Sequence, residues 1–280
     1  MSDSVENSES GNSPGDDPLA HCAAQVRQYD RDRYLASLFA PDDRRAALVA
    51  LYAFNLEIAR IGETVSEVLL GRMRLQWWRD SVGALFGEGT PPSHPVLIAL
   101  AATLSRHDLS RHLFEALLDA REFDLEEGGP ANMDQLVSYA EGSAGALSQL
   151  AIQALGATGE DARNAARHGG IAWGLVGLLR AAPFHAARGI SFLPRDLMET
   201  IGGSGEGPAV KAIATEARMH ITAARALHAS VPAGARAALL PLALIDGDLA
   251  RLERSGLTSG QPAHLGRLIR LAMAALRGRY

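Results

Sequence analysis

Helical periodicity governs almost the whole chain and leaves few alternatives to an all-α fold. Apolar side chains recur at intervals of three and four residues, as at Val49, Tyr52 and Leu56, which places them on one face of a helix. No run alternates apolar and polar residues with the period of two that a half-buried strand needs, and no segment repeats at solenoid spacing. The 280 residues therefore predict an all-α fold with one domain over residues 18–280.

Proline and glycine divide this pattern into separate predicted helices. Pro41 separates a first helix from a second that opens with an acidic turn, and Gly87 closes the next one. A later helix is expected to break or kink at Pro183, because proline lacks the backbone donor that a helix interior needs. The predicted helices span residues 19–40, 65–86, 96–107, 109–127, 132–156 and 161–182, with one more beginning at residue 42 and others completing the chain.

The first seventeen residues have a different composition from the rest. Residues 1–17 are rich in Ser, Asn, Gly and acid and almost free of apolar side chains, so they cannot offset the entropy of ordering. They predict a disordered acidic tail, which also lacks the basic start and apolar run of a secretory signal. No later stretch reaches the ~18 uninterrupted apolar residues of a membrane span. We expect the protein in the cytoplasm, or peripherally at the inner face of the cytoplasmic membrane.

The charge balance argues against nucleic acid as a partner. The chain has 27 basic and 32 acidic residues, and the net charge of −5 equals the five acidic residues of the tail. The remaining body is neutral, whereas nucleic-acid binders normally carry a basic excess. The single cysteine, Cys22, excludes an internal disulfide and a cysteine-cluster metal site, and the histidines show no metal-binding spacing.

Small residues crowd two of the predicted helices, at residues 142–146 and 169–177. Glycine costs a helix interior up to ~1 kcal/mol relative to alanine, so such a concentration indicates a specific requirement. Either the helix backbones approach closely there, or the helices leave room for a ligand between them. Close packing is the favoured interpretation.

Four segments occur in an order and spacing that resemble the squalene/phytoene synthase family. They are DRDRYLASLFAPDDRRAALVALYAF, RMRLQWWRD, YAEGSAGALSQLA and GLLRAAPFHAARGISFLP. The family joins two prenyl diphosphates head to head. The resemblance runs from about Tyr29 to Leu197 and implies a single-domain, isoprenoid-synthase-like helical bundle around a central cavity.

The family's chemistry depends on two aspartate-rich motifs on facing helices, whose carboxylates hold Mg²⁺ ions against the diphosphate groups. The resemblance places the first motif, Asp-Asp-x-x-Asp, on residues 59–63 of this chain. There Ala59 and Arg60 replace the two leading aspartates, and only Glu63 keeps a carboxylate.

The second motif, Asp-x-x-x-Asp, falls on residues 181–185. Ala181 and His185 replace its two aspartates, so four of the five carboxylates are missing from the pair of motifs. Losing these metal ligands removes the largest electrostatic contribution to diphosphate departure. The sequence therefore predicts no catalytic residue, no metal site and no cofactor, with Mg²⁺ required only if the protein is a prenyl transferase after all.

The degenerate pattern resembles one branch in particular, the mitochondrial respiratory complex I assembly factors of this family. The segments AFNLEIARIGETVSE, MRLQWWRD, HPV and LRAAPFHAARGISFLP have the style of that branch, which also lacks both motifs. The resemblance implies a non-catalytic protein that assists assembly of a membrane respiratory complex, with a subunit or assembly intermediate as its partner. The alternatives are a prenyl transferase that makes phytoene- or squalene-type products, and an isoprenoid- or lipid-binding protein.

Arg60 carries two competing interpretations. It falls on the same helical stripe as Leu56 and Glu63, so we expect it to face the former active-site cavity. The favoured interpretation is an internal ion pair with Glu57 or Glu63 that replaced a metal site. The alternative is an anion or ligand pocket in which Arg60, Arg180 and His185 supply the positive charge.

Two further patterns are interpreted from spacing. Asp119 and Asp124 lie five residues apart, off a common helix face, and are expected to be solvated. The C-terminal stretch carries Arg267 and Arg270 with no acidic residue, opposite a leucine-rich face, and predicts a basic amphipathic helix. Such a helix either packs with a solvated basic face or makes peripheral contact with an anionic membrane.

Overall fold

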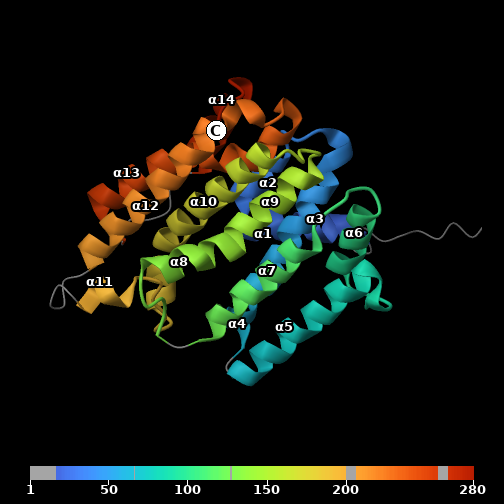
Figure 1. Cartoon of the computed structure of the whole chain (residues 1–280), viewed down its shortest axis with the longest axis horizontal. Helices are drawn as coiled ribbons and strands as arrows, with labels where there is room; N and C mark the ends of the chain where they lie inside the picture. The colour runs from blue at the N-terminus through green and yellow to red at the C-terminus, as the bar shows by residue number, and fades with distance from the viewer. Residues whose placement is uncertain (1–16, 66, 127, 200–205, 258–263) are drawn as a thin grey trace, which may run out of the picture.

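Helix α10 (Glu160–Ala186) runs through the middle of the molecule, and the other helices pack around it (Figure 1). The computed structural model describes residues 17–65, 67–126, 128–199, 206–257 and 264–280, and every regular element within those ranges is helical. Helix α12 (Glu206–Ala226) packs along one side of α10, and α8 (Met133–Ala140) and α9 (Ala146–Ala154) pack along another. The predicted all-α fold is confirmed.

The remaining elements extend this bundle on both sides. They are α1 (Pro18–Tyr29), α2 (Arg31–Ser37), α3 (Asp42–Ala59), α4 (Ile61–Thr64), α5 (Val68–Gly83), α6 (Pro95–Leu104), α7 (Arg111–Glu122), α11 (Arg195–Glu199), α13 (Ile245–Ser255) and α14 (His264–Leu276). Short π and 3₁₀ segments connect several of them, among them η2 (Phe123–Leu125), η3 (Glu141–Gly145) and η5 (Ala233–Leu244). Within the described ranges, no helix is both long enough and apolar enough to cross a bilayer.

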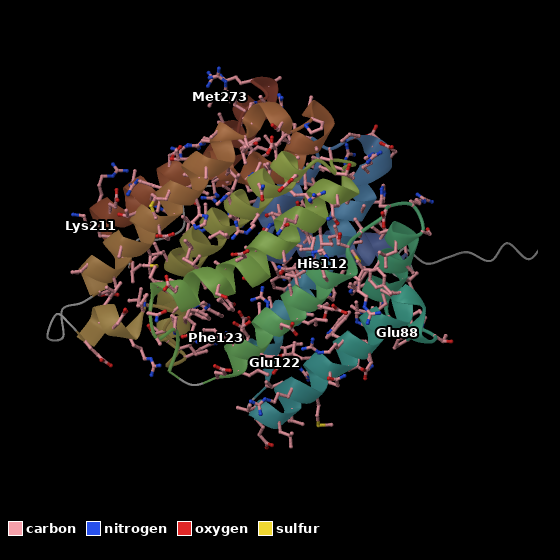
Figure 2. The ribbon with its side chains drawn as sticks, in the orientation of Figure 1. Glu88, His112, Glu122, Phe123, Lys211 and Met273 are labelled. Atoms are coloured by element: carbon pink, nitrogen blue, oxygen red, sulfur yellow. The ribbon has the colours of Figure 1, made fainter. Side chains whose placement is uncertain are left out.

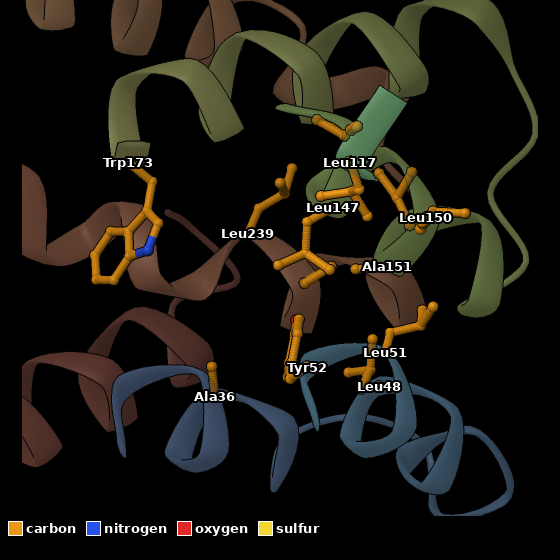
Figure 3. Packing of buried hydrophobic residues seen from close by; sticks show 14 of the residues in the cluster. Ala36, Leu48, Leu51, Tyr52, Leu117, Leu147, Leu150, Ala151, Trp173 and Leu239 are labelled. Atoms are coloured by element: carbon orange, nitrogen blue, oxygen red, sulfur yellow. The ribbon is translucent and has the colours of Figure 1, made fainter. Parts of the chain in front are cut away.

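The core lies where α3, α9, α10 and η5 meet. Leu48 and Leu51 of α3 project toward Leu147 and Leu150 of α9, and Leu239 of η5 fills the space beside them (Figure 3). All five side chains are almost fully buried, and burying each contributes about 1.5–3 kcal/mol. One continuous cluster of buried apolar residues extends from α1 to the C-terminus.

The predicted helix 19–40 is divided in two at Asp30. Its carboxylate accepts a hydrogen bond from the backbone N–H of Arg33 (3.3 Å) and pairs with the Arg33 guanidinium (2.8 Å). Aspartate is a strong N-cap, so α2 starts anew at Arg31 instead of continuing α1. The break turns Asp30 and Arg33 toward the interior cavity described below.

Helix α10 does not end at Pro183, so the predicted break at this residue was wrong. The helix continues to Ala186, and the carbonyl of Pro183 accepts a hydrogen bond from the Ala187 N–H (3.2 Å). Because Pro183 lies in the last turns of the helix, its missing N–H removes one backbone hydrogen bond, and the helix still continues for three more residues. His185 is therefore still presented on α10.

The glycine-rich segments are explained by close packing of α10 against η3. A Cβ on Gly170 would lie 2.4 Å from the carbonyl oxygen of Ala144 and 2.6 Å from the Cα of Gly145, which no side chain tolerates. The favoured interpretation of close backbone approach is confirmed at this position. Gly177 lies seven residues further along α10. A Cβ at this position would meet no atom within 4 Å, and Gly177 lines the interior cavity described below.

The predicted acidic tail lies outside the described residues except for Asp17. The Asp17 carboxylate accepts a hydrogen bond from the Leu19 N–H (2.9 Å) and caps α1, so this last residue of the predicted tail belongs to the helical body.

Candidate functional site

A cavity of ≈ 340 Å³ opens between the N-terminal half of the chain and α10. Ala59 and Glu63, from the end of α3 and from α4, line one wall, and Ala181 and His185 of α10 line another. The structure therefore brings the two degenerate motifs to one cavity. Trp173, together with small residues of α8 and α10, completes much of the lining.

Arg60 does not belong to this cavity. Helix α3 ends at Ala59, and Arg60 forms the junction to α4, so the continuous helical stripe assumed from the sequence is broken at this residue. Its guanidinium lies over the ring of Tyr29, 4.3 Å from the ring centre, and lines a separate cavity beside Trp77 and Trp78. The predicted grouping of Arg60 with Arg180 and His185 was therefore wrong.

The predicted ion pair of Arg60 is also not formed. Within the described part of the chain, no carboxylate lies within ion-pair distance of the Arg60 guanidinium, and Glu57 lines the same separate cavity without bonding to it. Glu63 instead lies 3.7 Å from Arg188, across the mouth of the first cavity. A half-buried arginine stacked on a tyrosine does not need an internal counter-ion.

Arg180 lines the first cavity, but internal contacts already neutralise its charge. The guanidinium lies 4.6 Å from the ring centre of Trp173 and approaches Asp248 (3.1 Å) and Asp32 (3.4 Å). A cation held by two carboxylates and an aromatic face has little capacity left for an anionic ligand.

Arg180 joins a buried ion network around Arg267. The Arg267 guanidinium binds Asp32 through two nitrogens (2.8 and 2.6 Å) and Asp248 through a third contact (2.7 Å). Burial works against the charge of Asp32, but the Arg267 hydrogen bonds and the charges of Arg267 and Arg180 outweigh it, so the pKa of Asp32 lies below its usual value. The network connects α2, α10, α13 and α14.

Sequence reasoning missed this network because it assigned Arg267 to a solvated basic face. Arg267 and Leu271 lie one turn apart on α14, and both are buried. The i, i+4 spacing of the two residues could have indicated the burial of Arg267, because it places the arginine on the same helix face as Leu271.

His185 is held among aromatic rings. Its ring centre lies 4.9 Å from that of Phe192, and its Nδ1 atom is buried without a hydrogen-bond partner in the described structure. Burial lowers the pKa of His185 below its usual value, although Asp124 and Glu63 oppose the effect. The imidazole is therefore neutral near pH 7 and supplies no positive charge to the cavity.

A second polar cluster, also missed from the sequence, is centred on Arg121. Its guanidinium contacts Asp124 (3.1 Å), the Tyr139 hydroxyl (2.7 Å) and the Asn55 side-chain oxygen (3.3 Å), and the Tyr139 hydroxyl donates to Asp124 (2.6 Å). Asp124, expected to be solvated, is only 13% exposed, whereas Asp119 is largely exposed. The 3₁₀ turn of η2 after α7 rotates Asp124 back toward the interior.

The carboxylates around the cavity do not fit Mg²⁺. Magnesium needs several oxygen ligands free to coordinate, yet each carboxylate here is engaged by a guanidinium. The pairs are Asp30 with Arg33 (2.8 Å), Glu63 with Arg188 (3.7 Å) and Asp124 with Arg121 (3.1 Å). Within the described residues, no group of three His, Cys, Asp or Glu side chains is arranged to hold a metal ion.

Helix α14 turns its apolar face outward. Leu265, Leu268, Ile269 and Leu276 are exposed, Leu276 to 87%, while Arg267 faces inward. Figure 2 shows the neighbouring Met273 at the outer edge of the molecule. The helix is amphipathic as predicted, but Leu271, Ala274 and Ala275 make its inner contacts with the core, and the leucine-rich stripe predicted from the sequence lies on the outer side.

The squalene/phytoene synthase family profile matches residues 26–268. The chain is 34% identical over 245 residues to mouse (Mus musculus) "NADH dehydrogenase (ubiquinone) complex I, assembly factor 6", an alignment that covers 84% of this chain and 73% of that protein.

An enzyme of the family and a solved enzyme structure share less sequence identity with the chain. The chain is 28% identical over 180 residues to the presqualene diphosphate synthase of Rhodopseudomonas palustris, covering 64% of this chain and 63% of that one. A crystal structure of a dehydrosqualene synthase superposes with a TM-score of 0.79 at 18% identity, covering 93% of this chain and 96% of that chain. That likeness shows the shared fold.

Proposed function

The chain belongs to the squalene/phytoene synthase family, and from this premise we propose that it is a non-catalytic member that assists assembly of a complex I-like membrane respiratory complex. Its partner is a subunit of that complex or an assembly intermediate. The proposal has two parts, the absence of prenyl transfer and the assembly role, and they rest on different evidence.

One observation carries the first part, the pairing of every carboxylate that lines the cavity. Asp30, Glu63 and Asp124 are each engaged by an arginine, and Ala59 and Ala181 replace two of the family's metal ligands. Diphosphate departure needs positive charge gathered at the leaving group. A cavity whose cations and carboxylates neutralise each other is poorly suited to that task.

The second part rests on the relatives. The complex I assembly factor of the mouse aligns over most of both chains, whereas the bacterial presqualene diphosphate synthase aligns less completely and at lower identity. Assembly of a respiratory complex takes place at a membrane, and the outward apolar face of α14 supports peripheral contact there. Arg270, Arg277 and Arg279 are exposed beside that face, and no acidic residue occurs after Glu253 to oppose an anionic surface. We place the protein at the cytoplasmic face of the membrane.

A neutral isoprenoid or lipid is a second candidate, as a ligand rather than a substrate. The cavity combines aromatic and small apolar walls with a buried polar atom, Nδ1 of His185, that has no hydrogen-bond partner in the described structure. A neutral molecule with one hydroxyl group would satisfy that atom without needing a counter-ion. Lipid extraction of the purified protein followed by mass spectrometry, with His185→Phe as the comparison, tests this ligand.

Deletion of the gene tests the assembly role. We expect loss of NADH dehydrogenase activity in isolated membranes and accumulation of a partial complex on native gels, both restored by the wild-type gene. Normal activity and a fully assembled complex in the deletion strain would overturn the proposal.

A further inference from the structure

A second exposed apolar stripe lies on α5, far from α14 (Figure 1). Leu69 and Leu70 are followed at helical intervals of three and four residues by Met73 and Trp77, and all four are exposed, Leu69 to 67%. The opposite face of α5, with Gly71, Leu75 and Trp78, is buried against the rest of the molecule. The exposed stripe extends over about two helical turns, or ~12 Å.

The stripe continues into the separate cavity of ≈ 390 Å³ that contains Arg60. We call the stripe and this cavity together the α5 groove. Trp77 belongs to both, and Trp78 and His94 form the floor, with the His94 ring centre 5.2 Å from that of Trp78. Amphipathic helices bind by placing their apolar face in a hydrophobic groove. An exposed apolar stripe beside a cavity lined by aromatic rings offers such a groove.

Two arginines give the α5 groove its charge. The Arg74 guanidinium donates a hydrogen bond to the Thr64 hydroxyl (3.0 Å), and the Thr64 hydroxyl in turn donates to the carbonyl of Arg60 (2.9 Å). Within the described residues neither Arg60 nor Arg74 lies within ion-pair distance of a carboxylate, although Glu57 lines the same cavity. Arginine and tryptophan are also the residues enriched at protein-binding hot spots.

We infer that the α5 groove is the docking site for an amphipathic helix of a protein partner, whose apolar face covers Leu69, Met73 and Trp77 and whose acidic side chain pairs with Arg60 and Arg74. The inference rests on the proposed assembly role for the nature of the partner. A protein helix fits better than an anionic bilayer, because the exposed acids Glu67 and Asp80 stand beside the stripe. Helix α14 has no such acids.

Site-specific photo-cross-linking in cells that contain the respiratory complex tests the inference directly. A photoreactive amino acid replaces Met73, and in a matched protein it replaces Met219 of α12, which is similarly exposed (60% and 55%). We expect an adduct from position 73 alone. Sequencing of the linked peptide should identify an apolar helical segment with an acidic residue from a subunit or assembly intermediate.

A binding measurement then tests the charge pairing. A synthetic peptide of the linked segment should bind the full chain and change its tryptophan fluorescence, and Trp77→Phe should reduce that change. Arg74→Glu should weaken binding at least about tenfold, and exchanging the peptide's carboxylate for lysine should recover much of that loss in the Arg74→Glu protein. Circular dichroism verifies that the exposed substitution leaves the fold intact.

Several outcomes would overturn the inference. They are a lipid adduct at position 73, an adduct with a second copy of this chain, equal adducts at positions 73 and 219, no adduct, or unchanged binding by Arg74→Glu. Complementation separates this inference from the assembly role. If Met73→Glu restores the deletion strain as fully as Met219→Glu, the docking site is refuted and the assembly role stands. If deletion of the gene has no effect, the assembly role is refuted, and the peptide-binding measurement still shows whether the α5 groove binds a helix.

Discussion

Arg267 is the single residue whose contacts most clearly secure the tertiary structure. It is 8% exposed and bridges Asp32 and Asp248, which approach it from α2 and α13. Neither carboxylate could regain water if the guanidinium were removed, because both are largely buried. The burial of this arginine makes α14 part of the folded body.

We therefore expect Arg267→Ala to lower the free energy of unfolding by about 3–5 kcal/mol, since it leaves two buried charges with less compensation. Arg270→Ala, three residues along the same helix and exposed, is the matched control and should cost less than ~1 kcal/mol. Urea denaturation followed by circular dichroism measures both. Equal losses in the two variants would contradict a structural role for the network.

Arg60→Ala should behave quite differently. An internal ion pair would have made its removal cost about 3–5 kcal/mol, but Arg60 is half-buried and stacked on Tyr29, 4.3 Å from the ring centre. Loss of such a cation–π contact costs roughly 0.5–1 kcal/mol. Denaturation under the same conditions checks this value. A loss above 3 kcal/mol would support an internal ion pair of Arg60 instead.

At the scale of elements, the contact between α10 and η3 depends on the absence of side chains. Gly170 brings the two backbones so close that a methyl group has no space, and a Cβ added to Gly174 would lie 3.0 Å from the Cβ of Ala144. Glycine is costly inside a helix, and close packing of the two elements offsets that cost.

Gly170→Ala should therefore destabilise the protein by at least about 1–3 kcal/mol, because overpacking forces the two helical segments apart. Gly177→Ala, on the same helix, meets no atom within 4 Å and should stabilise α10 by up to ~1 kcal/mol. Thermal unfolding distinguishes the two. A Gly170→Ala protein as stable as the wild type would contradict the prediction and would show that η3 can move away from α10 at little cost.

The contact between α10 and α12 contains a pair of histidines that makes stability depend on pH. Nδ1 of His168 lies 2.8 Å from Nδ1 of His220, so one ring must accept while the other donates. Burial lowers the pKa of both side chains, and the neighbouring positive charges, including Arg167, lower them further. Glu216 and Glu141 oppose the shift.

Since the folded pKa values lie below the unfolded value of about 6.5, the neutral pair contributes fully above that pH, and the contribution is lost as the pH falls through the folded values. The melting temperature should fall by several degrees between pH 7.5 and 5.5. His168→Gln/His220→Gln should reduce this fall without abolishing it, because burial also lowers the pKa of His94 and His185. The exposed His112→Gln is the control, and an unchanged slope in the double variant would contradict the prediction.

At the scale of the whole molecule, the cavity that brings the two degenerate motifs together is lined by internal ion pairs. Arg33, Arg121 and Arg188 hold its carboxylates, and Arg180 is held by Asp32 and Asp248. The family fold survives, as the TM-score of 0.79 to a dehydrosqualene synthase shows. A shared fold does not by itself imply a shared reaction.

We expect no magnesium-dependent binding of farnesyl or geranylgeranyl diphosphate. Titration calorimetry with and without Mg²⁺ measures binding, and product analysis after incubation with both diphosphates measures condensation. A working dehydrosqualene synthase serves as the positive control. Condensed product above a no-enzyme background would refute the non-catalytic proposal.

The sequence by itself determined the helical class and the position of the degenerate motifs. Helical periodicity depends on neighbours three and four residues apart, and the replacements at Ala59 and Ala181 can be read directly from the chain. The same local rules found the amphipathic pattern of α14, because it lies within one helix.

Only the tertiary structure decided which face of each helix meets which partner. The junction at Arg60 directs that side chain away from the cavity, and η2 directs Asp124 inward. Arg267 is buried because it pairs with Asp32, which lies 235 residues earlier in the chain. These outcomes depend on where helices end and which charges meet after packing. Periodicity within a helix carries no information about contacts between residues so far apart in sequence.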